Sequence, residues 1–535
     1  MDNLKTTEIA IIGAGPAGLA AAIEAAKAGA RVTLIDENAR PGGQLFKQIH
    51  KFFGSQAHGA GIRGFQIGQE LCEEAEKLGV ELLLNTTVYG LFEGCVLGLM
   101  NEHRTMLLKA EKIIIATGAT ENALPFPGWT LPGVMTAGAA QTMMNIHRVL
   151  PGKRVLMVGG GNVGLIVAYQ LMQAGAEIIA LVEATPQIGG YQVHAAKLER
   201  AGVKILTAHS IKEARGTTHV ESAVITKLGA GWRPIEGTEK EFEVDTICLS
   251  VGLTPNVETA WMAGCEFQYA KGRGGHVPVL DENMQTTLPG IYVAGDAAGV
   301  DEASIAMEEG RIAGIAAAES LGYIEPKKAE ILKTGYRNLL FELKQQERKE
   351  GKKGWETEFL TPEFMTKGPI PIIECTQYIP CNPCETSCPS HAIIVGKPIT
   401  NLPKLDLDKC TGCGICVACC PGLAIVLLDM TFSDTEALVT IPYEYLPMPQ
   451  VGAEVDAVNQ HGETLCKAKV IRILNPKSFA GTALVSIVVP KQVALEVKGL
   501  HIITNIIVHT ARLGLANPSL SARVFPMDLA IHREQ

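Results

Sequence analysis

The chain has 535 residues, of which 47% are hydrophobic and 19% charged, a composition typical of a folded protein with several buried cores. A formal net charge of −9 argues against nucleic acid as a partner, because such a surface needs a basic stripe. No stretch of about eighteen uncharged apolar residues predicts a transmembrane segment, and the N-terminal residues lack the pattern of a signal peptide, so we expect a cytoplasmic protein.

Residues 8–36 read as strand, turn, helix and strand, EIAIIGAGPAGLAAAIEAAKAGARVTLID. Gly13, Gly15 and Gly18 follow the apolar strand and begin an alanine-rich helix. Asp36 ends the second strand, at the distance where an acid meets a ribose hydroxyl. The glycines let the backbone approach a pyrophosphate, and the amides at the helix N-terminus stabilise its charge. This pattern predicts a dinucleotide site.

Three later segments extend this pattern. They are the turn PGGQ at residues 41–44, the run IIIATG ending at Gly118, and the run GIYVAGD ending in Gly295 and Asp296. With the glycine loop, they resemble the thioredoxin-reductase-like branch of two-dinucleotide flavoproteins over roughly residues 5 to 325. The resemblance implies one FAD, with the Asp296 carboxylate on its ribityl chain. The residues implied to bind FAD are Gly13, Gly15, Gly18, Asp36, Gly43, Gln44, Thr117, Gly118, Gly295 and Asp296.

A second fingerprint, RVLMVGGGNVG, lies between these segments. Its glycines are Gly159, Gly161 and Gly164, and the following strand ends at Glu183. An acidic residue there suits an unphosphorylated ribose, and the next residues, ATPQ, offer no arginine for a 2′-phosphate. We expect NAD or another adenine nucleotide rather than NADP at this site. The alternative is a fold element that binds nothing.

The segment TAGAAQTMMN, residues 136–145, corresponds to the region where disulfide reductases of the resembled family have a Cys-x2-Cys beside the flavin. It contains no cysteine, which excludes disulfide reduction by that route. No histidine and carboxylate are placed as acid and base for a substrate, so no catalytic residue is assigned. His50 is predicted to be an ordinary surface histidine, and the alternative is that it faces the flavin.

Nine of the fourteen cysteines lie between Cys375 and Cys420. The second half of this block has the bacterial ferredoxin spacing Cys-x2-Cys-x2-Cys-x3-Cys-Pro, in which three thiolates bind one cubane cluster and the fourth binds another. The block is also an internal repeat. A shift of thirty-two residues places Cys413, Cys416, Cys420 and Pro421 on Cys381, Cys384, Cys388 and Pro389.

The first repeat is imperfect, because the partner of Cys410 is Tyr378 and the nearest thiol is Cys375. We expect two [4Fe-4S] clusters whose ligands are Cys375, Cys381, Cys384 and Cys420 for one, and Cys388, Cys410, Cys413 and Cys416 for the other. One alternative is a zinc ribbon, since paired Cys-x2-Cys units also bind zinc. The other is that the displaced Cys375 leaves the first cluster incomplete. Clustered thiols in either case indicate a reducing compartment.

The remaining segments complete the predicted organisation. Residues from 325 to 354 indicate an amphipathic helix and a charged, solvated linker. Residues 430–500 alternate in the β fashion and predict a small antiparallel barrel or sandwich without a catalytic motif. The last thirty residues give no prediction of their role.

The sequence therefore predicts an α/β flavoprotein with two dinucleotide-binding domains, a ferredoxin-like 2[4Fe-4S] domain and a small C-terminal β domain. The predicted boundaries are 1–118 with 285–325 for FAD, 119–284 for NAD or an adenine nucleotide, 326–370 for the helix and linker, 371–429 for the clusters and 430–535 for the β domain.

A flavoprotein of this type with no redox disulfide, joined to an iron–sulfur module, resembles the larger subunit of heteromeric amine and amino-acid dehydrogenases. That group includes the B subunit of hydrogen cyanide synthase, the A subunit of opine oxidase and the α subunits of dye-linked proline and hydroxyproline dehydrogenases. Residues 116–141, ATGATENALPFPGWTLPGVMTAGAAQ, are especially similar to them. Many of these relatives have a shorter four-cysteine motif for one [2Fe–2S] centre, so the longer block leaves the electron acceptor open.

The resemblance implies a hetero-oligomer. A D-amino-acid-oxidase-like FAD subunit would oxidise the C–N bond of a substrate such as proline, hydroxyproline or sarcosine, and this chain would pass the electrons to an external acceptor. Two other functions fit the motifs. One is a self-sufficient NAD(P)H:acceptor oxidoreductase, and the other is a non-enzymatic iron–sulfur sensor or scaffold.

Overall fold

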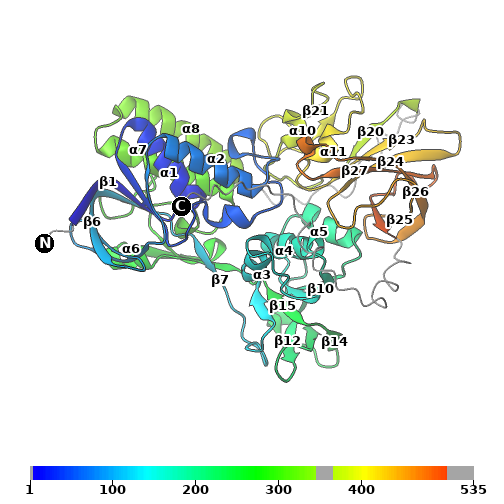
Figure 1. Ribbon diagram of the computed structural model, residues 1–535, viewed down its shortest axis with the longest axis horizontal. Helices are drawn as coiled ribbons and strands as arrows, with labels where there is room; N and C mark the ends of the chain where they lie inside the picture. Colours follow the sequence, from blue (N-terminus) through cyan, green and yellow to red (C-terminus); the bar gives the residue numbers. More distant parts are fainter. Residues whose placement is uncertain (1–3, 345–365, 503–535) are drawn as a thin grey trace, which may run out of the picture.

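The computed structural model describes residues 4–344 and 366–502. Part of the predicted linker, 345–365, and the last residues, 503–535, lie outside the described residues. Figure 1 shows three units. We define the first unit as residues 4–118 and 258–344, the second unit as residues 122–250 and the C-terminal unit as residues 366–502. The antiparallel pair β7 (Ala119–Glu121) and β16 (Leu253–Pro255) connects the first two units.

The first unit is built on a seven-stranded sheet with the order β3-β2-β1-β6-β5-β4, in which β19 also pairs with β6. The strands are β1 (Leu4–Ile12), β2 (Val32–Ile35), β3 (Glu81–Leu83), β4 (Thr87–Phe92), β5 (Val96–Met100), β6 (Thr105–Ile115) and β19 (Ile291–Val293). β1, β2, β3, β6 and β19 are parallel, and β4 and β5 extend the sheet in antiparallel fashion. Parallel strands are covered on both faces, which explains the buried apolar runs at residues 9–12, the end of β1, and at residues 113–115, the end of β6.

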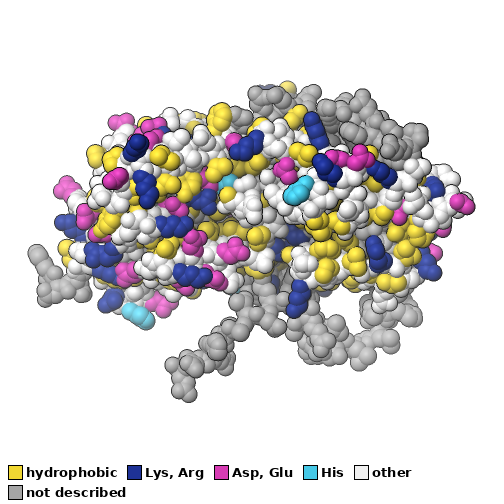
Figure 2. All heavy atoms as spheres, turned by 90° about the horizontal axis from the view of Figure 1, so that it is seen from above, with side chains coloured by type: hydrophobic (Ala, Val, Ile, Leu, Met, Phe, Trp, Pro, Cys, Tyr) yellow, Lys and Arg dark blue, Asp and Glu magenta, His cyan; other side chains and the backbone are white. Residues whose placement is uncertain are grey.

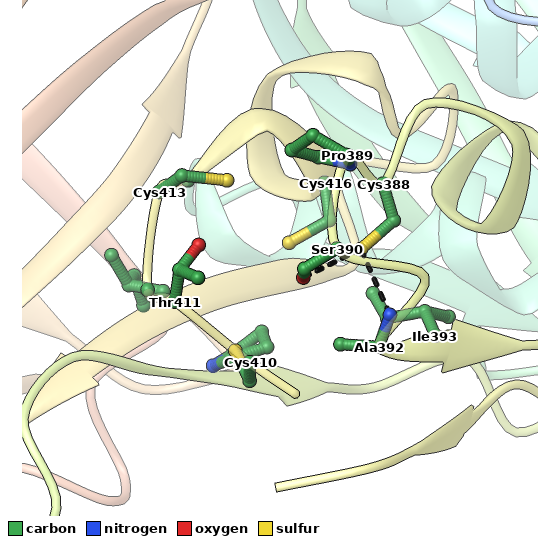
Figure 3. Close-up of a pocket in the computed structure, with 13 residues that line it drawn as sticks. Cys388, Pro389, Ser390, Ala392, Ile393, Cys410, Thr411, Cys413 and Cys416 are labelled. Atoms are coloured by element: carbon green, nitrogen blue, oxygen red, sulfur yellow. Dashed lines mark hydrogen bonds between the residues drawn. The ribbon is translucent and has the colours of Figure 1, made fainter. Parts of the chain in front are cut away.

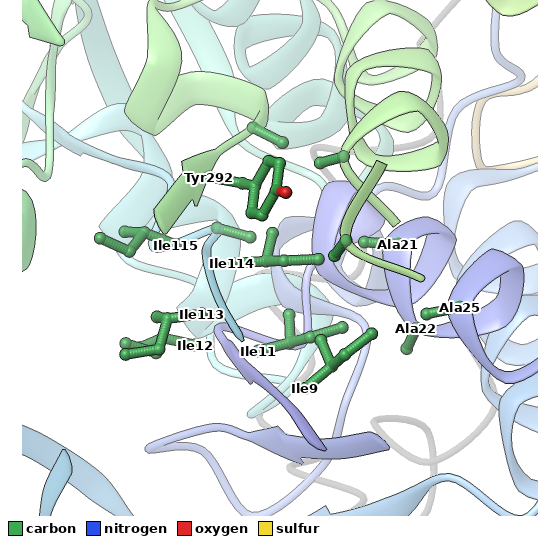
Figure 4. Close-up of a cluster of buried hydrophobic side chains, with 14 of the residues drawn as sticks. Ile9, Ile11, Ile12, Ala21, Ala22, Ala25, Ile113, Ile114, Ile115 and Tyr292 are labelled. Carbon is green, nitrogen blue, oxygen red and sulfur yellow. The ribbon is translucent and has the colours of Figure 1, made fainter. Parts of the chain in front are cut away.

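Helices α1 (Pro16–Ala28) and α7 (Ala303–Ser320) pack closely together in this unit. Figure 4 shows isoleucines of β1 and β6 in contact with the small side chains Ala21, Ala22 and Ala25 of α1. A Cβ at Gly310 or Gly314 of α7 would lie 2.1 and 2.3 Å from the carbonyl oxygens of Ala17 and Ala21. The two helices therefore touch through their backbones. The other helices of the unit are α2 (Gly64–Lys77), α6 (Glu258–Ala263) and α8 (Pro326–Lys344).

Residues 258–284 pack on the first unit, although we expected the second domain to extend to residue 284. Ala260, Cys265 and Met284 are buried in the same core as β1 and β6. The hairpin of β17 (Phe267–Ala270) and β18 (Gly275–Pro278) lies in this stretch. The chain leaves the second unit at β16, before residue 258, and the sequence motifs do not indicate this boundary.

The second unit has a five-stranded parallel sheet with the order β11-β10-β9-β15-β8 and a separate antiparallel sheet β12-β13-β14. Its strands are β8 (Val134–Thr136), β9 (Arg154–Val158), β10 (Glu177–Glu183), β11 (Ile205–Thr207), β12 (His209–Arg215), β13 (Ser222–Lys227), β14 (Lys240–Glu243) and β15 (Thr246–Leu249). Its helices are α3 (Ala137–Asn145), α4 (Asn162–Gln173) and α5 (Gln192–Arg200). As in the first unit, the strand before the glycine loop lies in the middle of the sheet.

The C-terminal unit is an antiparallel sheet with the order β20-β23-β24-β27-β26-β25-β28. The strands are β20 (Ile370–Ile373), β23 (Ile425–Asp429), β24 (Glu436–Tyr443), β25 (Glu454–Val458), β26 (Thr464–Leu474), β27 (Ala483–Pro490) and β28 (Gly499–Ile502). β28 also contacts β24, so the sheet curls round on itself. The cysteine block adds α10 (Pro383–Thr386), α11 (Ile415–Cys419) and the pair β21 (Ile393–Ile394) and β22 (Lys404–Leu405).

The cysteine block and the β-rich region share one core, although we expected a domain boundary after residue 429. Ile370 and Val426, from the strands that flank the block, are buried together with Val439 and Val485 of the following sheet. Figure 1 shows α10 and α11 beside this sheet, on the side of the first two units. The cysteine block is thus an insertion between two strands of one sheet.

Acidic and basic side chains are interspersed on the face of the molecule seen in Figure 2. Among the described residues, no helix is both long enough and apolar enough to cross a membrane.

Candidate functional site

The glycine loop between β1 and α1 combines close packing with open space. A Cβ at Gly13, whose φ is +100°, would lie 2.3 Å from the Ala116 carbonyl oxygen, and a Cβ at Gly18 would lie 1.8 Å from the Gly13 carbonyl oxygen. At Gly15, the N-cap residue of α1, a Cβ would meet nothing within 4 Å. Backbone N–H groups at this helix end can therefore donate to the phosphates of a ligand.

The Asp36 carboxylate is bound to this loop. Its Oδ2 accepts a hydrogen bond from the Ala14 N–H at 2.7 Å, and its Oδ1 accepts from the backbone and side-chain nitrogens of Asn38 at 2.8 Å. The residue is 7% exposed. Asp36 therefore orders the loop, and a carboxylate retains lone pairs that can accept from a ribose hydroxyl.

The other residues predicted to bind FAD lie round the same helix end. A Cβ at Gly43 would lie 2.8 Å from the Cα of Gly15, and a Cβ at Gly295 would lie 2.8 Å from the Cβ of Ala17. Beside Gly118 a Cβ would meet nothing within 4 Å. The structure thus brings the turn 41–44, the run before Gly118 and the Gly295–Asp296 pair to the N-terminus of α1.

The surroundings of the other three predicted FAD-binding residues, Asp296, Thr117 and Gln44, differ from one another. Burial raises the pKa of Asp296 to about 6, and its Oδ1 accepts a hydrogen bond from the Asp301 N–H at 3.2 Å. The Thr117 hydroxyl donates to the carbonyl oxygen of Asn256 at 2.6 Å, which connects this residue to the segment that follows β16. Gln44 is exposed.

The second glycine loop repeats the construction of the first. A Cβ at Gly159 would lie 2.0 Å from the Ser250 carbonyl oxygen and one at Gly164 2.1 Å from the Gly159 carbonyl oxygen, whereas a Cβ at Gly161 would meet nothing within 4 Å. The Glu183 carboxylate accepts from the Gly160 N–H at 2.7 Å through Oε2. Glu183 is therefore the counterpart of Asp36 in both position and contact.

A turn that the sequence analysis missed covers this second loop. The Gly190 N–H donates to the Gly160 carbonyl oxygen at 2.9 Å, as the Gly42 N–H donates to the Ala14 carbonyl oxygen at 2.7 Å in the first unit. The sequence contains a signal for it. The pair Gly189-Gly190 follows Glu183 by six residues, and the pair Gly42-Gly43 follows Asp36 by the same interval.

The first half of α3, in the segment where the sequence analysis found no Cys-x2-Cys pair, contacts charged side chains. The Gly138 N–H donates to Oε1 of Glu121 at 2.7 Å, and Lys47 Nζ donates to the Thr142 hydroxyl oxygen at 3.3 Å. Burial lowers the pKa of Lys47, and Glu121 partly opposes this. Neither residue was singled out from the sequence, because each becomes a neighbour of α3 only in the folded chain.

His50 is partly buried and packs against other aromatic rings, so the prediction of an ordinary surface histidine was wrong. Its ring packs on those of Phe52 and His194, with centroids 5.1 and 6.4 Å apart. Burial, followed by the charges of Lys197 and Arg63, lowers the pKa of His50 to about 3. The imidazole is therefore neutral at physiological pH.

Four thiols form what we call the inner set, Cys375, Cys381, Cys384 and Cys420. Cys375, Cys384 and Cys420 pack against one hydrophobic cluster that includes Val417, and Cys381 and Cys420 pack against another that includes Val193. Without metal, burial raises the pKa of Cys375 to about 12, and the neighbouring Cys420 adds to the rise. Burial and then Cys420 also raise the pKa of Cys381 and of Cys384 well above their usual range.

The other four predicted ligands form the outer set, Cys388, Cys410, Cys413 and Cys416, and all of them line one pocket. In Figure 3 their sulfur atoms face a shared space from different sides. Cys413 is exposed and Cys416 is buried. These four thiols are the ones that the ferredoxin spacing assigns to one cluster, and their binding of iron stays a prediction.

The internal repeat has a structural counterpart at the two Cys-Pro sequences. Cys388 Sγ accepts a hydrogen bond from the Ala392 N–H at 3.2 Å, and Cys420 Sγ accepts one from the Ala424 N–H at 3.4 Å. In both turns the third residue after the cysteine, His391 or Leu423, has a positive φ. Backbone N–H groups directed at sulfur stabilise a thiolate, the form that binds iron.

Whether the two thiol sets suit a metal depends on whether that metal is a single ion or a cluster. Among residues 4–344 and 366–502, no three His, Cys, Asp or Glu side chains converge on the position of a single metal ion. The four donors of each set are thiols, which are the ligands of four-iron clusters, and those of the outer set surround a space instead of a point. The donors of both sets therefore fit a four-iron cluster in their chemistry, and those of the outer set also line one common space.

Comparison with known proteins places these features in context. The family described as pyridine nucleotide-disulphide oxidoreductase matches residues 7–310. The A subunit of opine oxidase from Agrobacterium tumefaciens (strain Ach5) is 33% identical over 340 residues, which cover 59% of this chain and 66% of the relative. The chain thus spans just under two thirds of that protein.

Two further relatives are also named as subunits of enzymes. Hydrogen cyanide synthase subunit HcnB of Pseudomonas protegens (strain DSM 19095 / LMG 27888 / CFBP 6595 / CHA0) is 27% identical over 358 residues, which cover 62% of this chain and 74% of the relative. The alpha subunit of sarcosine oxidase from Rhizobium meliloti (strain 1021) is 27% identical over 339 residues, which cover 61% of this chain and 32% of the relative.

Proposed function

This chain belongs to the pyridine nucleotide-disulphide oxidoreductase family, and from that premise we propose that it is the FAD- and iron–sulfur-containing electron-transfer subunit of a heteromeric amino-acid or amine dehydrogenase. One observation supports this most directly. The two sets of four thiols lie on the C-terminal unit, which packs against the first unit. Helix α3 has no thiol that could accept electrons as a disulfide.

The residues of the chain have distinct roles in this proposal. The loop of Gly13, Gly15 and Gly18 binds the FAD pyrophosphate at the N-terminus of α1, and Asp36 holds that loop and accepts from the ribose. The eight thiolates of the two sets hold the irons. Bound FAD would exchange two electrons with a donor, and the clusters would transfer electrons singly.

The names of the relatives support a proposal for the partner and the substrate. The relatives described above are named as subunits, so we propose a hetero-oligomer with a D-amino-acid-oxidase-like FAD subunit. That subunit would oxidise a secondary amine or imino acid such as proline, hydroxyproline or sarcosine. We propose that an external acceptor takes the electrons and that the complex works in the cytoplasm, since clustered thiols are typical of a reducing compartment.

A second candidate function, that of an NADH:acceptor oxidoreductase, is favoured because the second glycine loop repeats the contacts of the first. The open space at Gly161 and the Glu183 contact suit NAD or another adenine nucleotide, and a nicotinamide there could make the chain an NADH:acceptor oxidoreductase. Stopped-flow mixing with NADH distinguishes the oxidoreductase from the electron-transfer subunit. Rapid bleaching of the flavin absorbance supports the oxidoreductase, and slow or no bleaching supports the electron-transfer subunit.

Copurification from the native host, followed by a dye-reduction screen of amines and imino acids, tests the proposal. We expect a second flavoprotein subunit to accompany the chain and dye reduction to require both. An isolated, homomeric chain that oxidises an amine by itself would contradict the proposal.

A further inference from the structure

We infer that the two thiol sets act in series: the inner set receives electrons from the flavin-binding unit, and the outer set releases them to a one-electron carrier in solution. This inference rests on the proposed function, because it takes each set to hold a four-iron cluster. It assigns each set a position in the electron-transfer path, and it gives that path a direction from the inner set to the outer set.

The first unit contacts the inner set directly. Cys381 forms an isolated β-bridge with Gly54, and the Asn382 N–H donates to the Gly54 carbonyl oxygen at 3.2 Å. A Cβ at Gly61 would lie 3.3 Å from the Cβ of Pro383, next to Cys384. Residues 50–63 follow the PGGQ turn that packs on the glycine loop. A short stretch of chain therefore connects the glycine loop between β1 and α1 with the thiols of the inner set.

The second unit covers the inner set from another side through α5. Val193, which is 4% exposed, packs on Gly422, where a Cβ would lie 3.0 Å from it. Lys197 Nζ donates to the Pro421 carbonyl oxygen at 2.6 Å, and Arg200 donates to the Leu423 carbonyl oxygen at 3.1 Å. These contacts enclose the turn that begins at Cys420, so the inner set is shielded by both nucleotide-binding units.

Two buried lysines flank Cys420, one from each unit. Lys51 of the first unit is 4% exposed and donates to the Ala418 carbonyl oxygen at 2.5 Å, and Lys197 of the second unit is 5% exposed. A cluster with four thiolates is anionic, so two nearby cations favour its reduction. The inner position is thus suited to accept an electron.

The outer set has different surroundings. All residues lining its pocket come from the stretch 371–427, that is, from the C-terminal unit itself. Cys413 and Thr411 are exposed at the molecular surface, and Figure 3 shows both at the edge of the shared space. An exposed ligand shortens the distance to a docked carrier, which makes this set the exit.

The two sets are neighbours because each repeat contributes to both. Cys384 of the inner set and Cys388 of the outer set are four residues apart, and so are Cys416 and Cys420. If each set holds a four-iron cluster, the bound clusters would supply one-electron transfer, so two electrons from the donor would pass one at a time from the side of the inner set to the side of the outer set. Two carriers are reduced for each donor oxidised, and the protons released at the flavin go to solvent.

Electron paramagnetic resonance of the reduced, full-length protein tests the inference. A soluble gadolinium chelate is added as the probe, and the relaxation of each cluster signal is measured. We expect one signal to relax faster with the chelate and the other to remain unchanged. In the Cys413→Ser variant the chelate-sensitive signal should be the altered one, and in Cys381→Ser the insensitive one.

A variant that keeps every ligand covers the case in which a cysteine variant fails to fold. Thr411→Glu places a negative charge beside the outer set, so only the chelate-sensitive cluster should shift to a lower potential. A shift confined to the insensitive cluster, or equal sensitivity of both signals, would overturn the serial order. Absence of iron–sulfur signals from anaerobically prepared protein would instead refute the proposed function.

Discussion

Asp36 and Glu183 show how one residue type serves two glycine loops. Each carboxylate accepts the N–H of the residue between the first two glycines, Ala14 or Gly160, at 2.7 Å. The acid therefore has a structural role before any nucleotide binds. Because the loops belong to separate sheets, the effects of removing the two acids should be separable.

Asp36→Ala should weaken FAD binding, whereas Glu183→Ala should leave it intact. Loss of a hydrogen bond to a charged group costs about 1.5–3 kcal/mol, which corresponds to roughly a 10- to 100-fold loss of affinity. Fluorescence titration of the deflavinated protein with FAD measures it. Equal weakening by both substitutions would contradict the assignment of FAD to the first loop.

Lys51 is a buried cation of the first unit with three acceptors in the C-terminal unit. Its Nζ donates to the carbonyl oxygens of Ala418 and Phe479 at 2.5 and 2.9 Å and to the Thr482 hydroxyl oxygen at 2.7 Å. Burial lowers its pKa to about 8, and Glu444 partly opposes this.

Lys51→Met should lower the reduction potential of the inner cluster, because an anionic cluster loses a neighbouring positive charge. A redox titration followed by paramagnetic resonance measures the change, and Lys477→Met, at an exposed lysine, is the control. An unchanged or raised potential in Lys51→Met would show that this lysine does not act on the cluster.

At the scale of elements, α7 is joined to its neighbours in two ways. Glycines on one face allow the backbone of α7 to touch that of α1, and Glu302 at its N-cap accepts a hydrogen bond from the hydroxyl of Tyr191 in the second unit at 2.5 Å. The first contact fixes the core of the first unit. The second links that unit to the glycine turn over the second loop.

Gly314→Ala should destabilise the protein. The new Cβ would lie 2.3 Å from a backbone oxygen of α1, which cannot rotate away, and such overpacking costs about 1–3 kcal/mol. Gly335→Ala is the matched control, because a Cβ there meets nothing within 4 Å. In α8 that change should be neutral or stabilising by up to about 1 kcal/mol. Melting temperatures at equal FAD content compare the two, and an equal effect would contradict the backbone contact.

Glu302 should make stability depend on pH. Burial raises its pKa to about 6, while the Tyr191 hydroxyl opposes the rise. The folded protein then holds a proton that the unfolded chain releases, so this stabilisation is complete below about pH 4.5 and is lost as pH rises through about 6. Glu302→Gln, which keeps an acceptor for Tyr191, should gain up to about 2 kcal/mol relative to the native chain at neutral pH and little at about pH 4.

Melting temperatures of Glu302→Gln and the native chain across this pH range provide the measurement. Glu330→Gln is the control, since the pKa of that exposed glutamate is lowered. A gain for Glu302→Gln that does not change with pH would indicate an effect other than titration.

Local patterns in the sequence predicted the loops and thiols, because glycine spacing, strand-end acids and cysteine intervals are short-range features. They could not predict contacts between distant segments. Lys51 lies more than 360 residues before Ala418, and residues 258–284 return to the first unit only through β16. His50 was assigned to the surface because nothing beside it in the sequence indicates that Phe52 and His194 enclose it.

At the scale of the whole molecule, charges from all three units meet beside the inner set. Burial alone would raise the pKa of Glu444, but Arg63, Lys51 and Lys197 outweigh it and hold the pKa below its usual value. These partners come from the first and second units, whereas Glu444 follows β24 of the C-terminal unit. The relative placement of the units is thus fixed where electrons would cross between them.

Metal, acid-labile sulfide and flavin analysis of the anaerobically purified chain tests the central claim most directly. We predict one FAD, about eight irons and about eight sulfides per chain, since eight thiols divide into two four-iron sites. About four irons would mean that Cys375 is not a ligand and that the inner set is incomplete. Stoichiometric zinc without labile sulfide would contradict the account, because the thiol sets would then be zinc sites with no part in electron transfer.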